Sequence, residues 1–473
     1  MSFRWRVLPK SSNRRASIQT THVHARVLRN LMTQTMSRWL ISIACFICLN
    51  SLFAAAQSAT PSSNNTASDL KFVVYLSRHG VRSPTGMPEQ YNPYSLAPWP
   101  AWDVPPGYLT AHGYQLMKLF GAYDRMELAN EGLLSPSGCK DASKVSFYAD
   151  SDQRTRETGK ALAEGLFPGC RTDVQFRPEG TNDPLFHFHP TQAQLGAQTP
   201  AQATAAIAGR IGGDPANLTE AYRTQLGTLD TILATCGSPA PPQHKRVSLF
   251  DIPATLTPGS GGHVAELRGP LNTASTLVEN LLLEHTQGME ASSVGWGCVD
   301  GTKLRSLMEL HSAATDFTER TPVLAKIGAS NLLTVIDKSI EQAVTQKAIH
   351  GIPGKPGDRA LFLIGHDTNL TNIAGLLSLT WIADGRRDDT PPGGALIFEL
   401  WRNRKTGKFS VRTYFTVQTL EQMRSSATLT LSNPPQRVPV FLPGCSQKDF
   451  SCPLPAFTQA VHHKIDSRYV TTR

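Results

Sequence analysis

The chain has 473 residues, of which 40% are apolar and 18% charged, with 36 Gly, 33 Pro and 8 Cys. This length supports two or three domains, and the near-average composition excludes a disordered, collagen-like or small disulfide-rich protein. The formal charge of +9 is concentrated in residues 1–56, which hold eight Lys or Arg and no acidic residue. Subtracting those eight from the 46 basic residues leaves 38 against 37 acidic ones. We therefore expect no nucleic-acid partner.

Residues 1–56 have the pattern of a leader followed by a secretory signal peptide. A short basic start at Met36–Arg38 precedes the apolar run LISIACFICL at 40–49, and small residues follow up to Ala56 and Ala59. These are the three parts of a secretory signal, whereas the alternative, a membrane anchor, needs a longer apolar run. We therefore expect cleavage near Ala56 or Ala59, no membrane association of the mature chain, and a periplasmic or secreted protein.

The cysteines that follow the signal indicate disulfides. An even number in an exported chain favours disulfides over metal ligation, and none of them has zinc-site spacing. Cys445 and Cys452 enclose a short loop and form the expected local pair. The six cysteines are Cys139, Cys170, Cys236, Cys298, Cys445 and Cys452.

Strands alternate with helices along the chain, which predicts an α/β sheet. The first strand is expected at Asp69–Leu76, and Thr110 caps the helix after it. The other expected elements are a strand at Val145–Ala149, helices at Gln153–Leu166 and Leu332–Val344, a strand at Ala360–Gly365, and a terminal hairpin of Ala395–Trp401 with Phe409–Val417.

The region between the expected helices at Gln153–Leu166 and Leu332–Val344 has a different composition. It is rich in Ala, Gln, Thr and Leu and has no strand-like runs, which predicts an inserted α-helical domain at residues 191–315. The α/β domain then has two parts, at 57–190 and 316–473, after the leader at 1–56.

The first strand runs into the sequence RHGVRSPT at 78–85. The imidazole of His79 can attack phosphorus, while the guanidiniums of Arg78 and Arg82 hold phosphate oxygens. Gly80 allows close backbone approach and Pro84 stiffens the exit. The alternative, a basic surface loop, is a poorer explanation of this combination of residues.

Two further segments end strands in the same way. His366 and Asp367 follow the strand at Ala360–Gly365, and they can bind a phosphate oxygen and protonate a leaving group. Taken alone, this pair could be a helix cap. Arg154 lies in the first turn of the helix after Val145–Ala149, where it can add charge to an anion site or lie on a solvated face. Ligands gather beyond the carboxyl ends of strands, so the segments of His79 and His366 are expected to meet.

These residues resemble the histidine acid phosphatases, in particular the bacterial periplasmic phytase and glucose-1-phosphatase branch. The resemblance covers most of residues 70–460. The matching segments are Arg78–Thr85, Leu109–Tyr114, Asp152–Gly159, Gly295–Gly297, His366–Asn369, Thr390–Gly394, Gln418–Arg424 and Pro443–Cys445.

The resemblance implies roles for individual residues. His79 is the expected nucleophile and Asp367 the proton donor. The implied substrate-binding residues are Arg78, Arg82, Ser83, Pro84, Thr85, Arg154, His366, Thr368 and Glu279, although Glu279 could equally lie on a solvated helix face. The resemblance also implies the disulfides Cys139–Cys170 and Cys445–Cys452, which leaves Cys236 and Cys298 as the remaining pair.

The family further implies a central sheet with flanking helices, similar to that of phosphoglycerate mutases, and an inserted α-helical domain. The expected function is that of an exported acid phosphomonoesterase of phytase type. Its partner is a small phosphate monoester, it acts as a monomer, and it needs no metal or cofactor because arginines neutralise the phosphate. Gly86 stands where related phytases often have Lys, which leaves a sugar-phosphate phosphatase as an alternative. A periplasmic phosphate-ester binding protein would use the same cationic pocket. A phosphomutase belongs to the same superfold, but the expected export argues against it.

Overall fold

The computed structural model describes residues 67–237, 245–259 and 264–471. The expected leader and signal at 1–56, with its cleavage site, lies outside the described residues. Among those that are described, no helix combines the length and apolarity needed to cross a membrane.

The centre of the fold is a mixed eight-stranded sheet. Its order is β11-β10-β9-β1-β6-β2-β3, with β12 also paired to β10. The half from β1 to β3 is parallel, whereas β9 to β12 are antiparallel. The strands are β1 Ser68–Arg78, β2 Val145–Ala149, β3 Val174–Phe176, β6 Ala360–Gly365, β9 Ala395–Asn403, β10 Phe409–Val417, β11 Gln436–Val440 and β12 Ser451–Pro453.

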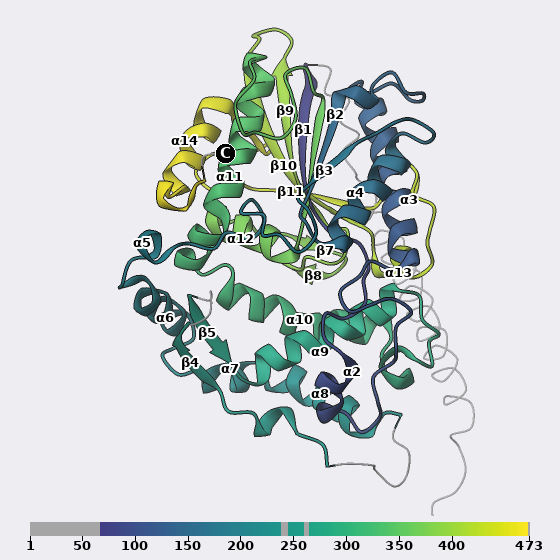
Figure 1. The fold of residues 1–473 in the computed structure, drawn as a ribbon, viewed down its shortest axis with the longest axis vertical. Helices are drawn as coiled ribbons and strands as arrows, with labels where there is room; N and C mark the ends of the chain where they lie inside the picture. Colours follow the sequence, from purple (N-terminus) through teal and green to yellow (C-terminus); the bar gives the residue numbers. More distant parts are fainter. Residues whose placement is uncertain (1–66, 238–244, 260–263, 472–473) are drawn as a thin grey trace, which may run out of the picture. The chain divides into compact units, whose positions relative to one another are not determined.

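Helices cover both faces of this sheet (Figure 1). One face packs on α3 (Ala111–Asn130) and α4 (Gln153–Leu166), the other on α11 (Pro322–Thr345), α12 (Asp367–Leu377) and α14 (Leu454–Lys464). Successive side chains of a strand point to opposite faces. In β1, Val73 and Tyr75 accordingly join the first core, and Val74 and Leu76 join the second. Burial on both sides explains why the expected strands are nearly continuous apolar runs.

The segment between β3 and α11 is mainly helical, as expected. Its helices are α5 Gln192–Leu195, α6 Thr199–Arg210, α7 Ala216–Ala221, α8 Arg223–Thr235, α9 Pro270–Thr286 and α10 Gly301–Thr318. The expectation of no strands here is wrong, because β4 (Thr255–Pro258) and β5 (Ala265–Arg268) form an antiparallel pair. Four residues per strand are too few for a recognisable alternation. The domain boundaries themselves stay a prediction.

Several elements differ in extent from the sequence-based expectation. β1 continues to Arg78 and α11 begins ten residues before Leu332. The hairpin of β9 and β10 is not terminal, because β11, β12 and α14 follow it and β9 pairs with β1 inside the sheet. The short strands β3, β11 and β12 have few apolar residues, so their sequences carry little signal. The other α-helices and strands are α2 (Pro88–Tyr91), α13 (Leu420–Arg424) and the pair β7 (Ile382–Ala383) with β8 (Arg386–Arg387), and short 3₁₀ helices lie between elements.

The six cysteines form the three expected pairs. Cys139–Cys170 spans 31 residues, Cys236–Cys298 spans 62, and Cys445–Cys452 spans 7. Cross-linking the unfolded chain removes more entropy when the closed loop is longer.

We therefore expect the three disulfides to differ in their effect on stability. On loop length alone, replacing Cys236 and Cys298 by Ser should lower the free energy of unfolding by about 4 kcal/mol, and replacing Cys445 and Cys452 by about 2 kcal/mol. Urea denaturation of the two double variants measures this difference. A larger loss for the Cys445/Cys452 variant would contradict it.

Candidate active site

Three neighbouring parallel strands end at the same edge of the sheet and place the site. Arg78 at the end of β1 is in register with Gly365 at the end of β6, and Ala149 of β2 is in register with the residue before Gly365. The residues that directly follow these three strands therefore lie at the same edge of the sheet. They are His79, His366 and Asp150. The backbone N–H of His79 donates to the carbonyl of Gly365 at 3.0 Å, which fixes the first two segments together.

His79 lies at the centre of this edge and is 2% exposed. Burial, together with the positive charges of Arg154, Arg78 and Arg82, holds the pKa of His79 well below its usual range. The ring is therefore neutral near pH 7. Its Nδ1 lies 2.9 Å from the carbonyl oxygen of Gly80. A carbonyl oxygen can only accept, so Nδ1 carries the ring proton and donates a hydrogen bond to it. Nε2 is left with a free lone pair.

Three guanidiniums surround this histidine. Nη1 of Arg78 donates to the carbonyl of Thr390 at 2.7 Å, and Nη1 of Arg82 donates to the carbonyl of Ser83 at 2.9 Å. Nη2 of Arg154 lies 3.4 Å from Nδ1 of His366. Arg78 and Arg82 are buried, and these backbone contacts fix the direction of their remaining N–H groups. Such a group of fixed cations can bind a small oxyanion.

Two carboxylates balance part of this charge. Oε1 of Glu279, on α9, accepts hydrogen bonds from Nη2 of both Arg78 and Arg82. Oδ2 of Asp367 lies 3.0 Å from Nη2 of Arg78. Burial alone would raise the pKa of each carboxyl, but the arginines outweigh burial and hold both values below their usual range. Glu279 is therefore an ionised member of the site, and the solvated-face alternative is wrong.

Asp150 and His187 were not among the expected site residues. Oδ2 of Asp150 accepts from Nε2 of His366 at 2.7 Å and from Nε2 of His187 at 2.9 Å. The Asp150 hydrogen bond raises the pKa of His187, and the two histidines hold the pKa of Asp150 low in spite of its burial. Asp150 could have been found from its place directly after β2. His187 follows no strand, so nothing local in the sequence marked it.

Within the described chain, the same residues form a cluster with the donor types of a metal site. Ligand atoms of Asp150, Asp152, His187 and His366 lie within 4.8 Å of one another. Both histidines direct Nε2 at Asp150, however, and Asp152 lies 2.6 Å from Nη2 of Arg154. These groups are thus already paired with one another and with a cation, and we assign no metal to them.

The other expected residues lie around this centre. Oγ of Ser83 donates to the carbonyl of Pro105 at 2.6 Å, and Ser83 and Pro84 line a neighbouring cavity. Thr85 is exposed. The N–H of Thr368 donates to Oδ1 of Asp367 at 2.8 Å and so orients that carboxylate. This bond lies in the first turn of α12, whose N-terminal dipole also favours an anion.

Close packing at the start of α3 explains the glycine in Leu109–Tyr114, one of the segments that resemble the family. Oγ1 of Thr110 caps this helix by accepting from the N–H of Gly113 at 2.9 Å. A Cβ on Gly113 would lie 2.1 Å from the carbonyl oxygen of Val81. Only glycine therefore lets α3 pack directly against the loop that carries Arg82.

A neutral buried imidazole among three guanidiniums, beside an ionised carboxylate, defines a phosphoryl-transfer type of site. The sequence matches the histidine phosphatase superfamily (branch 2) over residues 69–208 and 279–416. The chain therefore belongs to the histidine phosphatase superfamily, branch 2.

Individual relatives agree with this assignment. The chain is 36% identical over 401 residues to the phytase AppA of Escherichia coli (strain K12), covering 83% of this chain and 91% of that protein. It is 29% identical over 414 residues to a glucose-1-phosphatase of Providencia rettgeri, with 84% and 93% covered. The solved structure of Hafnia alvei phytase in complex with tartrate matches with a TM-score of 0.78 at 36% identity, covering 86% of this chain and 99% of that one.

The contacts of Glu279 lead to a prediction about anion affinity. Its carboxylate occupies N–H groups of Arg78 and Arg82 that a phosphate would use. Glu279→Gln keeps the shape but removes the competing charge, so inorganic phosphate should inhibit the variant at a concentration at least about tenfold lower. Inhibition constants for phosphate, measured side by side, test this. An unchanged or weaker inhibition would show that Glu279 does not compete with the anion.

Proposed function

We propose that the protein is an exported acid phosphomonoesterase of phytase type that forms a phosphohistidine at His79. The observation that carries the proposal is the state of this ring. It is neutral, its Nδ1 is bound to the carbonyl of Gly80, which leaves Nε2 with a free lone pair, and the charges of Arg154, Arg78 and Arg82 act on the ring. A binding protein would need the arginines but has no use for such a nucleophile.

The reaction proceeds in two steps. Nε2 of His79 forms a bond to phosphorus while the ester P–O bond breaks, and the carboxyl of Asp367 gives its proton to the departing oxygen. Water then attacks the phosphohistidine, Asp367 takes a proton from that water, and the N–P bond breaks to release phosphate and restore His79. The arginines hold the phosphoryl oxygens, and this electrostatic contribution lowers the barrier without a metal or cofactor.

Asp367 needs a proton for the first step, yet the arginines keep its pKa low when the site is empty. A bound phosphate ester neutralises those same arginines. Its negative charge lies close to Asp367 and disfavours ionisation of the carboxyl. Substrate binding thus raises the pKa of Asp367, and the acid forms where and when the leaving group needs it.

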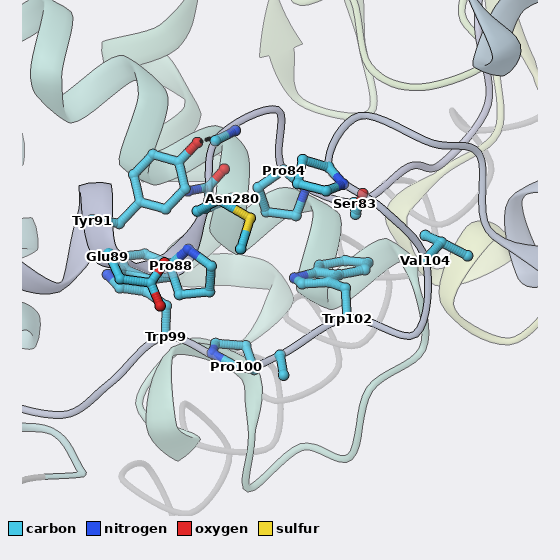
Figure 2. Close-up of a pocket in the computed structure, with 14 residues that line it drawn as sticks. Ser83, Pro84, Pro88, Glu89, Tyr91, Trp99, Pro100, Trp102, Val104 and Asn280 are labelled. Carbon is cyan, nitrogen blue, oxygen red and sulfur yellow. Dashed lines mark hydrogen bonds between the residues drawn. The ribbon is translucent and has the colours of Figure 1, made fainter.

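Relatives support phytate as a substrate, because the proteins that match at 36% identity are phytases. One observation favours the second candidate, a glucose-1-phosphatase or other sugar-phosphate phosphatase. Gly86 stands where phytases often have Lys, and no Lys or Arg is among the described residues that line the cavity beside Gly86 (Figure 2). A panel of esters at acid pH, with phytate and glucose 1-phosphate side by side, tests the substrate.

We propose the periplasm or secretion as the location, and the disulfides support it. We also propose a monomeric enzyme whose helical domain at 191–315 is inserted in the α/β domain.

The position of the phosphoenzyme is directly testable. Acid-quenched turnover should lose its label, and alkali-quenched turnover should keep it, because a phosphoryl–nitrogen bond is acid-labile and alkali-stable. His79→Ala should show no label and lose nearly all activity, since the three arginines surround the imidazole of His79 itself. An acid-stable label, or labelling of the variant, would move the nucleophile elsewhere. Failure of the wild-type protein to hydrolyse any monoester would instead favour a binding protein.

The role of Asp367 predicts a dependence on the leaving group. Asp367→Asn should lose roughly 10²–10⁴-fold in the phosphorylation rate on an alkyl phosphate, but much less on nitrophenyl phosphate, whose anion leaves without a proton. On the alkyl ester, the wild-type rate should fall as pH rises through the pKa of Asp367 in the substrate complex, and the variant should lack this basic limb. Pre-steady-state rates with both esters measure it. Equal losses on both would leave Asp367 a positioning residue for His366.

A further inference from the structure

The loop that carries His187 is bonded to the start of α12. Nδ2 of Asn369, in the first turn of that helix, donates to the carbonyl of Phe186 at 2.7 Å, and its Oδ1 accepts from the N–H of His366 at 2.8 Å. The N–H of His187 donates to the carbonyl of Asp183 at 2.8 Å. One side chain thus holds His366 and the residue before His187 together, so the fold itself fixes the position of His187 beside the site.

One oxygen of Asp150 accepts hydrogen bonds from two imidazoles. Asp150 is fully buried, and its Oδ1 has no hydrogen-bond partner among the described residues. Its Oδ2 lies 2.7 Å from Nε2 of His366 and 2.9 Å from Nε2 of His187, and the centres of the two rings are 4.7 Å apart. A carboxylate oxygen only accepts, so each ring carries a proton on Nε2. The two imidazoles therefore share the charge of a single buried carboxylate.

The proton on Nε2 decides what His366 presents to the phosphate-binding arginines. In a neutral imidazole with this proton, Nδ1 has a free lone pair. Nδ1 of His366 lies 3.4 Å from Nη2 of Arg154 and accepts from it, while Oδ2 of Asp152 holds the same nitrogen at 2.6 Å. If His366 were protonated, its Nδ1 would carry a hydrogen and would face Arg154 as a second cation. The neutral state of His366 is therefore the state that holds Arg154.

His187 is the ring of this pair that can take a positive charge. Its side chain is 39% exposed, whereas that of His366 is 5% exposed. The hydrogen bond to Asp150 raises the pKa of His187. Burial lowers the pKa of His366, and the charges of Arg154 and His187 lower it further although Asp150 opposes them. Protonated His187 and ionised Asp150 balance each other, so no uncompensated charge remains that would favour a second proton on His366.

Other charged groups surround His187, but the contact with Asp150 has the largest effect on it. Asp152 raises the pKa of His187, and Arg154 lowers it. His187 also lines a cavity of about 630 Å³, and the other titratable side chains in that lining are Glu266, Arg268, Glu319 and His189. Burial raises the pKa of Glu319 to about 7, so this carboxyl is mostly neutral at acid pH.

We propose that His187 is a positioning residue, which balances Asp150 so that His366 stays neutral and its Nδ1 holds Arg154 in the phosphate-binding cluster. The proposal rests on the proposed phosphatase function and adds a residue to its site. The protonated ring of His187 also adds one positive charge near the bound phosphate. When His187 loses its proton to solvent, the charge of Asp150 is uncompensated, and the site attracts an anion less strongly.

The consequence is a basic limb that does not depend on the leaving group. His187→Gln places an amide nitrogen near the position of Nε2, so it keeps the donor to Asp150 but cannot take a charge. Nitrophenyl phosphate is the substrate, because its anion leaves without a proton from Asp367. The ratio of wild-type to variant kcat/KM, in which the ionisation of the ester cancels, should be about three- to tenfold at acid pH and should approach 1 above the pKa of His187.

The titration of the histidine rings measures the positioning without turnover. In the wild type, NMR of ring nitrogens should find the Nε2–H form of His366, neutral at a pH where His187 is already protonated. In His187→Gln and His187→Ala the pKa of His366 should rise, because the charge that lowered it is gone. His187→Ala also removes a donor from Asp150, so it should lose more kcat/KM than His187→Gln at every pH.

The control is His189→Gln, because His189 is exposed and lies two residues further along the same loop. It should keep the wild-type kcat/KM and leave the titration of His366 unchanged. A loss in His187→Gln that is equal at all pH values, with an unchanged titration of His366, would overturn the proposal, and so would full activity in His187→Ala. If the wild-type protein hydrolyses no ester, the proposed function fails, whereas the NMR titrations still decide the role of His187.

Discussion

The site depends on keeping three guanidiniums together around one neutral histidine. Like charges at this distance repel, and burial of Arg78 and Arg82 removes water that would screen them. Backbone carbonyls and the carboxylates of Glu279 and Asp367 supply the compensation. Burial, together with the same positive field, lowers the pKa of His79 and keeps it unprotonated. The same arrangement of charge therefore produces both the neutral nucleophile and the anion site. A change to one of them also changes the other.

The sheet supplies the rigidity that this arrangement needs. β1, β6 and β2 are adjacent, parallel and buried on both faces, so the residues at their carboxyl ends cannot move independently. Charged side chains attached to flexible loops would relax away from one another. Here His79 and His366 are held from the strands themselves, whereas Glu279 comes from a helix on the other side of the site.

The sequence predicted the part of the site that is local in the chain. The strand ends were visible as apolar runs, and the residues directly after them, His79 and His366, were identified from that position. Glu279 was proposed from resemblance, but its contact with Arg78 spans 201 residues, and no local pattern encodes such a distance. His187 was missed for the same reason. Among the strands, β4, β5 and the edge strands β3, β11 and β12 escaped prediction because they are too short or too polar to show a period.

The position of Glu279 also has a consequence for the end of the catalytic cycle. A carboxylate held on α9 is a tethered competitor, present at a far higher effective concentration than any free anion. Inorganic phosphate can occupy Nη2 of Arg78 and Arg82 only when it displaces the carboxylate of Glu279. Each time the phosphate partly leaves, this carboxylate can bind again. A cluster of arginines strong enough to hold a phosphoryl group would otherwise retain its product. We expect the carboxylate of Glu279 to lower the affinity for the product and so to speed its release.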